Sequence, residues 1–307
     1  MIQQFDNLVQ LFQAFPTEQA AIDHLTSIRW ARGKFCPLCG NADEKRIGTL
    51  VGTNTHKCYA CRKRFSIKVG TIFQDTKLPL RTWYAAIWMI TNHPKGIAST
   101  TLARDLGITQ KTAWFVLHRL RHAARTDSFN GPLSGSVEVD ETFVGGRESN
   151  KHKSKKLNQG RGIVGKTVVL GMVQRNGEIR AGVVPDTRRA TLQGVVREHV
   201  EKGANLYTDE HSSYRGLNDE YAHHTNHHMS GRYVIDGHNH TNTIESVWAL
   251  LKRQIIGVHH WISPKHLDRY VGEMTYRLNN RELSVGGIVN DLLRRSEGPL
   301  PYKVLIS

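Results

Sequence analysis

Residues 136–146 read SVEVDETFVGG, a stretch in which apolar and polar side chains alternate strictly. Because successive side chains of a β-strand point to opposite faces, this alternation predicts a strand with one apolar and one polar face. The apolar face carries Val137, Val139 and Phe143, and the polar face carries Glu138, Asp140 and Thr142. A carboxylate in mid-strand among apolar residues is costly unless it binds something. Asp140 is therefore a candidate functional residue, and Glu138 on the same face could support it.

The residues that follow predict more strands and one helix. A basic, glycine-containing loop spans residues 145–165, and Asn176-Gly177 marks a hairpin turn between two β-branched runs. Residues 188–203 have the spacing of an amphipathic helix, and residues 204–210 (ANLYTDE) that of a short strand. Three strands, a helix, another strand and later helices predict a mixed α/β domain.

Residues 160–167, GRGIVGKT, match the phosphate-loop pattern. That motif requires a strand before the glycines and a helix after them. Here a polar, basic segment precedes the glycines, and the β-branched run TVVLGMV follows them. We interpret these residues as the entry to the second strand of the domain, and not as a nucleotide site.

Two further acidic residues stand where a fold could bring them to Asp140. Asp209 ends the short strand, and Glu245 lies in residues 240–255, HTNTIESVWALLKRQI. That segment predicts a helix with a buried stripe made of Ile244, Val247, Leu251 and Ile255. Lys252 follows Glu245 by seven residues, nearly two helical turns, so both share one helix face. A single acid of this kind would be read as a cap or an ion-pair partner, whereas three in this order predict a shared site.

Three converging carboxylates suit one kind of chemistry. In-line cleavage of a phosphodiester uses two metal ions about 4 Å apart, one activating the attacking oxygen and one stabilising the leaving oxygen. Hard carboxylate oxygens are the ligands that Mg²⁺ prefers. We therefore expect Asp140, Asp209 and Glu245 to hold magnesium. Histidine is a poorer ligand for such ions, and His238 and His240 are candidate contacts to the scissile phosphate instead.

All four cysteines of the chain lie in one short segment. They form two CxxC pairs with eighteen residues between them, Cys36 with Cys39 and Cys58 with Cys61. Each pair can hold one side of a tetrahedral zinc ion, and we prefer zinc to disulfides because the N-terminus shows no secretion signal. Residues 56–70 alternate apolar and basic side chains, as one hairpin of a zinc ribbon would. The basic run Arg62, Lys63 and Arg64 directly after the last cysteine predicts contact with phosphate.

Residues 98–123 have the pattern of a helix-turn-helix. Gly107 makes the turn, and Thr109 is a capping residue for a second helix whose apolar face packs inward. The remaining side chains should face outward, and they are Gln110, Lys111, Trp114, His118 and Arg121. A plain helical hairpin would share much of this pattern, but the basic outward residues favour DNA reading by Lys111 and Arg121.

Composition agrees with a nucleic-acid partner. Forty-two Lys and Arg against 27 Asp and Glu give a net charge of +15, and such a field attracts polyanions. The longest apolar run near the front is much shorter than a membrane span, and no signal peptide is recognisable. We therefore expect a cytoplasmic, nucleoid-associated protein with no membrane partner.

Several of these motifs together resemble a known family. VEVDETFVGG, YTDEHSSY and HTNTIESVWALLKR are similar to the catalytic motifs of DDE transposases from bacterial insertion sequences. The subgroup that the chain resembles carries an N-terminal zinc ribbon ahead of a ribonuclease H-like domain. The likeness covers most of the chain, from the CxxC pairs to residues 257–282.

The resemblance implies a function for the whole chain: cleavage of DNA at the ends of the element and strand transfer into target DNA. Asp140, Asp209 and Glu245 would hold two Mg²⁺ ions, for which Mn²⁺ can substitute, and Lys252 would contact DNA. Related enzymes can carry asparagine as the third member, so Asn242 is the alternative to Glu245. The resemblance also implies a homo-oligomer on the terminal repeats and target DNA.

We expect three domains: N-terminal helices with a zinc ribbon (1–70), a helix-turn-helix region (71–127) and a ribonuclease H-like catalytic domain (128–307). Two other functions compete with transposition. One is a zinc-containing transcription regulator, which has no need of the acidic triad, and the other is a structure-selective nuclease on the same fold, which would not join strands.

Overall fold

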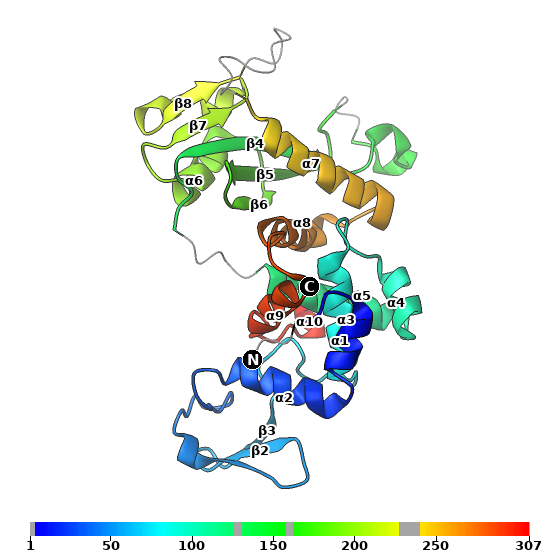
Figure 1. Ribbon diagram of the computed structural model, residues 1–307. Helices are drawn as coiled ribbons and strands as arrows, with labels where there is room; N and C mark the ends of the chain where they lie inside the picture. The colour runs from blue at the N-terminus through cyan, green and yellow to red at the C-terminus, as the bar shows by residue number, and fades with distance from the viewer. Residues whose placement is uncertain (1–3, 126–130, 158–161, 227–239, 307) are drawn as a thin grey trace. The chain divides into compact units, whose positions relative to one another are not determined.

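The structure is a computed structural model that describes residues 4–125, 131–157, 162–226 and 240–306 (Figure 1). The chain divides into two units. One unit contains Met1–Thr126 together with Asn280–Ser307, and the other contains Asp127–Asn279. This division differs from the three expected domains, because the zinc segment, the helix-turn-helix and the C-terminal tail share one unit.

The first unit is helical apart from its zinc segment. Its helices are α1 (Leu8–Ala14), α2 (Glu18–Arg29), α3 (Leu80–Asn92), α4 (Ser99–Leu106), α5 (Gln110–Ala124), α9 (Val285–Arg294) and α10 (Tyr302–Ile306). Thr17 begins α2 as expected, its side chain accepting a hydrogen bond from the Ala20 N–H at 3.2 Å. The apolar stripe of α3 is the centre of the unit, where Trp83 and Tyr84 are almost completely buried.

The C-terminal tail belongs to this unit because it pairs with residues near the N-terminus. Arg29 forms an ion pair with Glu297 at 2.6 Å, and the Ile72 N–H donates to the Ser296 carbonyl at 2.8 Å. Helix α9 also packs against α2 and α3. Assigning residues 280–307 to the catalytic domain from sequence missed these contacts.

The zinc segment forms a small antiparallel sheet of β1 (Ile47–Thr49), β2 (Thr55–Cys58) and β3 (Arg64–Ser66), preceded by the 3₁₀ turn Glu44–Arg46. The expected hairpin is β2 with β3, which pair from Thr55 opposite Ser66 to Lys57 opposite Arg64. Strand β1 was not expected, and it adds to β2 on the other side.

The helix-turn-helix pattern is confirmed as local structure. Helix α4 ends at Gly107, whose φ of 64° lies in the left-handed region that glycine adopts without strain. Helix α5 then begins after Thr109, whose side chain accepts from the Thr112 N–H at 3.2 Å.

The second unit is a five-stranded mixed sheet in the order β6-β5-β4-β7-β8. The strands are β4 (Ser136–Val144), β5 (Thr167–Gln174), β6 (Ile179–Val184), β7 (Asn205–Thr208) and β8 (Ala222–Thr225). Strands β4, β5 and β6 are antiparallel, whereas β7 runs parallel to β4 and β8 parallel to β7. The first strand, β4, lies at the centre of the sheet, with β5 and β6 on one side and β7 and β8 on the other, and the expected mixed α/β fold is confirmed.

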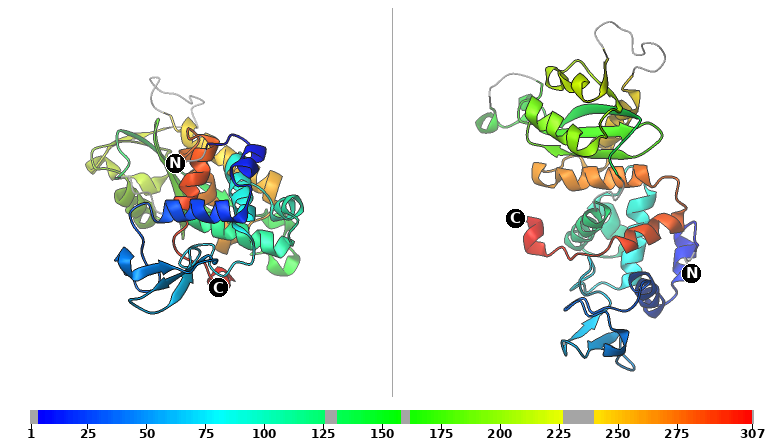
Figure 2. Two further views of the ribbon diagram at one scale, coloured as in Figure 1. Left: turned by 60° about the horizontal axis from the view of Figure 1, so that its bottom comes forward. Right: turned by 90° about the vertical axis from the view of Figure 1, so that its left-hand side faces the viewer.

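Helices cover both faces of this sheet. Helix α6 (Arg189–His199) packs on the face that carries Val137 and Val139, and α7 (Asn242–Gln254) with α8 (Pro264–Asn279) packs on the opposite face. Figure 1 shows α7 lying across β4 and β5, and the right-hand view of Figure 2 shows α8 beneath the sheet. Short turns complete the unit: 3₁₀ segments at Glu148–Asn150, Lys153–Lys155, Ser212–Tyr214 and Leu217–Asp219, and a π-helical turn at Ile255–His259.

The phosphate-loop match is not a nucleotide site of the usual kind. Residues 158–161 lie outside the described part of the chain, but Thr167 begins β5, so a strand follows the motif where a phosphate loop requires a helix.

Candidate active site

The parallel pairing of β4 and β7 brings the first two candidate acids close to each other. Glu138 lies opposite Tyr207, so the same offset sets Asp140 beside Asp209 two residues later. Strand β7 ends at Thr208, and Asp209 follows directly. Its Oδ1 accepts a hydrogen bond from the His211 N–H at 3.0 Å, which holds the turn that leaves the strand.

Asp140 is mostly enclosed, and its neighbours resist its ionisation. Burial is the main cause that raises the pKa of Asp140 to about 7, followed by the negative charges of Glu141 and Asp209. The indole N–H of Trp248, on α7, donates to Asp140 Oδ2 at 2.9 Å and acts in the opposite sense. Helix α7 is therefore tied to the strand that carries the first acid.

Glu141 is the residue next to Asp140 in the sequence, and the alternation of β4 points the two side chains to opposite faces. Its side chain lies on the other face of β4, where the Tyr214 hydroxyl donates to its Oε2 at 2.6 Å. Burial is the main cause that raises the pKa of Glu141; the hydrogen bond from Tyr214 lowers it, and the negative charge of Asp209 raises it. Glu141 is thus close enough to Asp140 and Asp209 for the three carboxyl groups to interact electrostatically.

The third candidate lies on the helix that contacts Asp140. Glu245 is in the first turn of α7, one turn before Trp248, and its Oε1 accepts from the Thr241 hydroxyl at 3.3 Å. Glu245 and Asn242 are both exposed, so burial does not choose between them. Among the described residues, the three acids do not form a closed group with all ligand atoms within 4.8 Å of one another, as the cysteines do.

The four cysteine sulfurs have the spacing of a zinc site. All lie within 4.8 Å of one another, with Cys36 Sγ 3.9 Å from Cys61 Sγ and Cys39 Sγ 3.8 Å from Cys58 Sγ. A tetrahedral ion with zinc–sulfur bonds of about 2.3 Å requires sulfurs about 3.8 Å apart, so the residues fit zinc. Four thiolates leave no open position, and the site is structural.

The predicted DNA-contacting residues fall into two groups. Five are exposed, namely Arg62, Lys63, Arg64, Lys111 and Lys252. Arg121 is 1% exposed and His118 is fully buried, so the prediction that they face outward from α5 is wrong. The inward stripe of α5 is wider than the sequence pattern indicated, because His118, Arg119 and Arg121 join the apolar residues inside.

Two other expectations concern the histidines near α7. His238 lies outside the described residues, whereas His240 lies near the buried carboxylate of Glu138, with Nδ1 3.4 Å from Oε1. The helical pattern aligns Trp248 with Glu245 and Lys252 on one face of the helix, since residues three apart are neighbours on a helix surface. The hydrogen bond from Trp248 to Asp140 could not be predicted from that pattern.

Comparisons with known proteins agree with this architecture. The ISXO2-like transposase domain model matches residues 132–279, and the transposase zinc-ribbon domain model matches residues 16–64. A Haemophilus influenzae protein described as an "uncharacterized transposase-like protein" is 32% identical over 102 residues, which cover 33% of this chain and 80% of that protein. The chain belongs to the ISXO2-like transposase family.

A second relative of this transposase spans nearly its full length. It is a Halobacterium salinarum protein described as an "uncharacterized protein in transposable element ISH50", 27% identical over 84% of this chain and 90% of its own length. Among solved structures, the Mos1 strand transfer complex matches with a TM-score of 0.20 and 14% identity, covering 66% of this chain and 78% of that one. This TM-score is too low for the Mos1 structure to inform on the fold or function of the transposase.

The transposase has no helix, among its described residues, that is both long and apolar enough to cross a membrane.

Proposed function

We propose that this transposase cleaves DNA at the ends of its element and joins them to target DNA, with divalent metal ions held by Asp140, Asp209 and an acid of α7. The observation that supports this most is the proximity of Asp140, in the middle of β4, to Asp209, which directly follows the adjacent parallel strand β7. The family membership supplies the reaction class, and the acid pair supplies a place for it.

The side chains that could bind a metal ion at this site fit a hard cation. Asp140 and Asp209 offer carboxylate oxygens, which suit Mg²⁺ or Mn²⁺ better than softer metals. Burial is the main cause that raises the pKa of Asp140, and the negative charges of Glu141 and Asp209 add to it. A divalent cation would relieve that repulsion. When bound, such ions polarise the scissile phosphate and activate the attacking oxygen.

The remaining residues of the site have positioning roles. Trp248 donates its indole N–H to Asp140 Oδ2 and so fixes the orientation of that carboxylate. Glu245, on the same helix as Trp248, is the third acid of the proposed site. We prefer it to Asn242 because its charge suits Mg²⁺. Lys252, exposed two turns further along α7, would contact the DNA backbone.

Asp140→Asn tests the proposal, because it keeps the side-chain shape while removing the charge. We expect end cleavage and joining in Mg²⁺ to fall by at least about a thousandfold, since losing a metal ligand removes several kcal/mol of charge stabilisation. Binding to element ends should stay within about threefold of the unchanged protein, because other surfaces hold the DNA.

Asp219→Asn is the matched control. Asp219 is exposed and precedes β8, so it lies toward the opposite end of the sheet from Asp209. This variant should cut and join at the normal rate. Cleavage without any joined product in the unchanged protein would favour a nuclease, and retained cleavage by Asp140→Asn would remove Asp140 from the metal site.

A further inference from the structure

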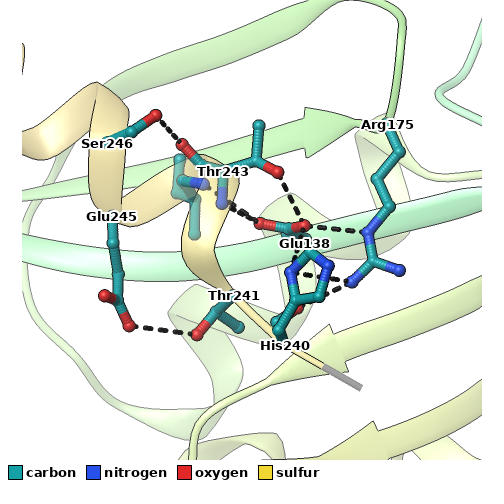
Figure 3. A network of polar contacts seen from close by, with 8 residues as sticks. Glu138, Arg175, His240, Thr241, Thr243, Glu245 and Ser246 are labelled. Carbon is teal, nitrogen blue, oxygen red and sulfur yellow. Dashed lines mark hydrogen bonds and ion pairs between the residues drawn. The ribbon is translucent and has the colours of Figure 1, made fainter. Parts of the chain in front are cut away.

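Glu138 is a fully buried carboxylate that the proposed chemistry does not use. It lies two residues before Asp140 on the same face of β4, and its relative exposure is 0%. A buried carboxylate is tolerated only when donors satisfy its oxygens. Figure 3 shows Glu138 beneath the first turn of α7, with Thr243 on one side and Arg175 on the other.

Each oxygen of Glu138 receives two hydrogen bonds. Oε1 accepts from the Thr243 hydroxyl at 2.9 Å and from Arg175 Nε at 2.8 Å. Oε2 accepts from the backbone N–H groups of Thr243 at 2.9 Å and Ile244 at 3.0 Å. These are the second and third residues of α7, whose N–H groups have no partner inside the helix.

The helix does not supply this cap itself. In the described part of the chain, the N-cap residue Thr241 makes no side-chain cap hydrogen bond, and its hydroxyl donates to Glu245 instead. Glu138 therefore caps α7 from a strand that is more than a hundred residues earlier, and its charge lies at the positive end of the helix dipole.

Arg175 connects this cap to the segment that enters the helix. Besides its ion pair with Glu138, its Nη2 donates to the His240 carbonyl at 2.8 Å. Its guanidinium lies 4.2 Å from the centre of the Tyr207 ring on β7, and its backbone N–H donates to the Ser136 carbonyl at 2.9 Å. The arginine thus joins β4, β7 and the start of α7.

A second attachment point lies one turn further along the same helix. Glu138 holds Ile244, and Asp140 accepts from Trp248. Two residues along a strand advance about 6.6 Å, and four residues along a helix advance about 6 Å. Because these spacings match, the two contacts fix α7 along β4, and Glu245 lies between them in the sequence.

From this geometry we propose that Glu138, with Arg175, is a positioning residue that sets the first turn of α7 against the strand of Asp140. It thereby determines where the third metal ligand stands. The inference rests on the proposed function for its catalytic consequence, but it holds whether Glu245 or Asn242 is the ligand, because both lie in that first turn.

The main test is Glu138→Gln, which keeps the shape but turns an NH₂ group toward donors. Cleavage of element ends is measured as a function of Mn²⁺ concentration. We expect the half-saturating Mn²⁺ concentration to rise about 10- to 100-fold, as for other residues that orient metal ligands, with end binding unchanged. Thr243→Val removes one of the four hydrogen bonds and should give a smaller shift in the same direction.

Glu178→Gln is the matched control. Glu178 pairs with Arg180 at 3.1 Å beside β6, and the same substitution there should leave the Mn²⁺ dependence unchanged. If Glu138→Gln does not fold, Thr243→Val carries the test alone. An unchanged Mn²⁺ dependence in a folded Glu138→Gln or Thr243→Val variant would overturn the proposal.

Hydrogen exchange separates this inference from the proposed function. The amides of Thr243 and Ile244 should exchange at least about tenfold faster in Glu138→Gln than in the unchanged protein or in Glu178→Gln. If the unchanged protein fails to cut DNA at all, the proposed function fails, whereas the amide exchange still decides the capping role. Equal exchange in all three proteins would show that Glu138 does not hold the helix.

Discussion

A single glycine makes room for the indole that touches the first acid. Gly171 on β5 lies directly opposite Asp140, and a Cβ built on it would come within 2.5 Å of the Trp248 ring and 2.8 Å of Ile244. Both neighbours belong to α7, and a side chain at position 171 would force the side chains of Trp248 and Ile244 to move. The absence of a side chain at Gly171 is therefore part of the site.

We predict that Gly171→Ala destabilises the second unit by about 1–3 kcal/mol, the usual cost of overpacking a core. Because Trp248 must shift, the hydrogen bond to Asp140 should weaken and cleavage should fall as well. Urea unfolding followed by tryptophan fluorescence measures the first effect. Gly182→Ala is the control, because its added Cβ meets Asp268 at an ordinary 3.5 Å; equal stability of the two variants would contradict the prediction.

At the scale of residues, the sequence identified acids more easily than their supports. Asp140 and Asp209 stand out because each is a charge beside an apolar strand. Glu138 has the same sequence signature, and only the contacts with α7 show that it serves as a cap. Arg121 was placed on the wrong side of α5 because a helical pattern treats a cation as an outward residue, whereas its aliphatic stem can be buried.

At the scale of elements, the fold of the zinc ribbon depends more on its metal ion than on its own apolar core. Its buried cluster consists of Cys36, Ile47, Cys58 and Phe65, so two of its four members are metal ligands. A core this small does not offset the conformational entropy of the segment, and the free energy of metal binding must supply the difference.

We therefore predict that Cys58→Ser, or a strong zinc chelator, unfolds residues 36–66 while the second unit stays folded. The chain should hold one zinc ion, released by the chelator and absent from the variant. Metal analysis and hydrogen exchange across both units measure these outcomes. Val51→Ser, at a fully exposed position in the same ribbon, should keep its zinc, and a ribbon that stays protected after zinc loss would refute the structural role.

Helices with a local N-cap and a regular apolar spacing could be predicted, whereas short strands that depend on pairing with a neighbouring strand could not. Helices α2 and α5 begin at the expected Thr17 and Thr109, because an N-cap is a local property. Strands β1 and β8 were missed, because they are three and four residues long and lack alternating apolar residues. Each is an edge strand, held by pairing with β2 or β7 and not by its own composition.

For the whole molecule, the order of the parts along the chain could be predicted, but their grouping into two units could not. Residues 280–307 fold with the N-terminal unit through contacts such as Arg29 with Glu297, which are 268 residues apart. No local pattern announces a pairing of that range. The pairing of β5 with β6 was easier to predict, because the turn at Asn176-Gly177 is a local hairpin signal.

The transposase has a net charge of +15, and its affinity for DNA depends on which of its Lys and Arg side chains are exposed. Each phosphate neutralised by Lys or Arg adds about 0.9 to the slope of log K against log salt concentration. Arg62, Lys63 and Arg64 are consecutive, exposed and adjacent to the last zinc ligand, whereas Arg121 is buried and cannot reach phosphate where it stands.

We predict that replacing Arg62, Lys63 and Arg64 together by glutamine weakens binding to element ends and lowers the salt slope by about 2 to 3. The catalytic acids are untouched, so cleavage at saturating protein should stay within about threefold of normal. Titrations of labelled ends at four salt concentrations give the slope. Lys202→Gln is the control, because that ammonium pairs with Glu220 at 3.2 Å and should not alter the slope.

Arg121→Gln should instead lower the free energy of unfolding, since it removes a buried charge from its partners, and leave the slope unchanged. A lowered slope for Arg121→Gln in a stably folded protein would mean that α5 turns its basic residues toward DNA after all, and an unchanged slope for the triple variant would remove the ribbon from the DNA interface.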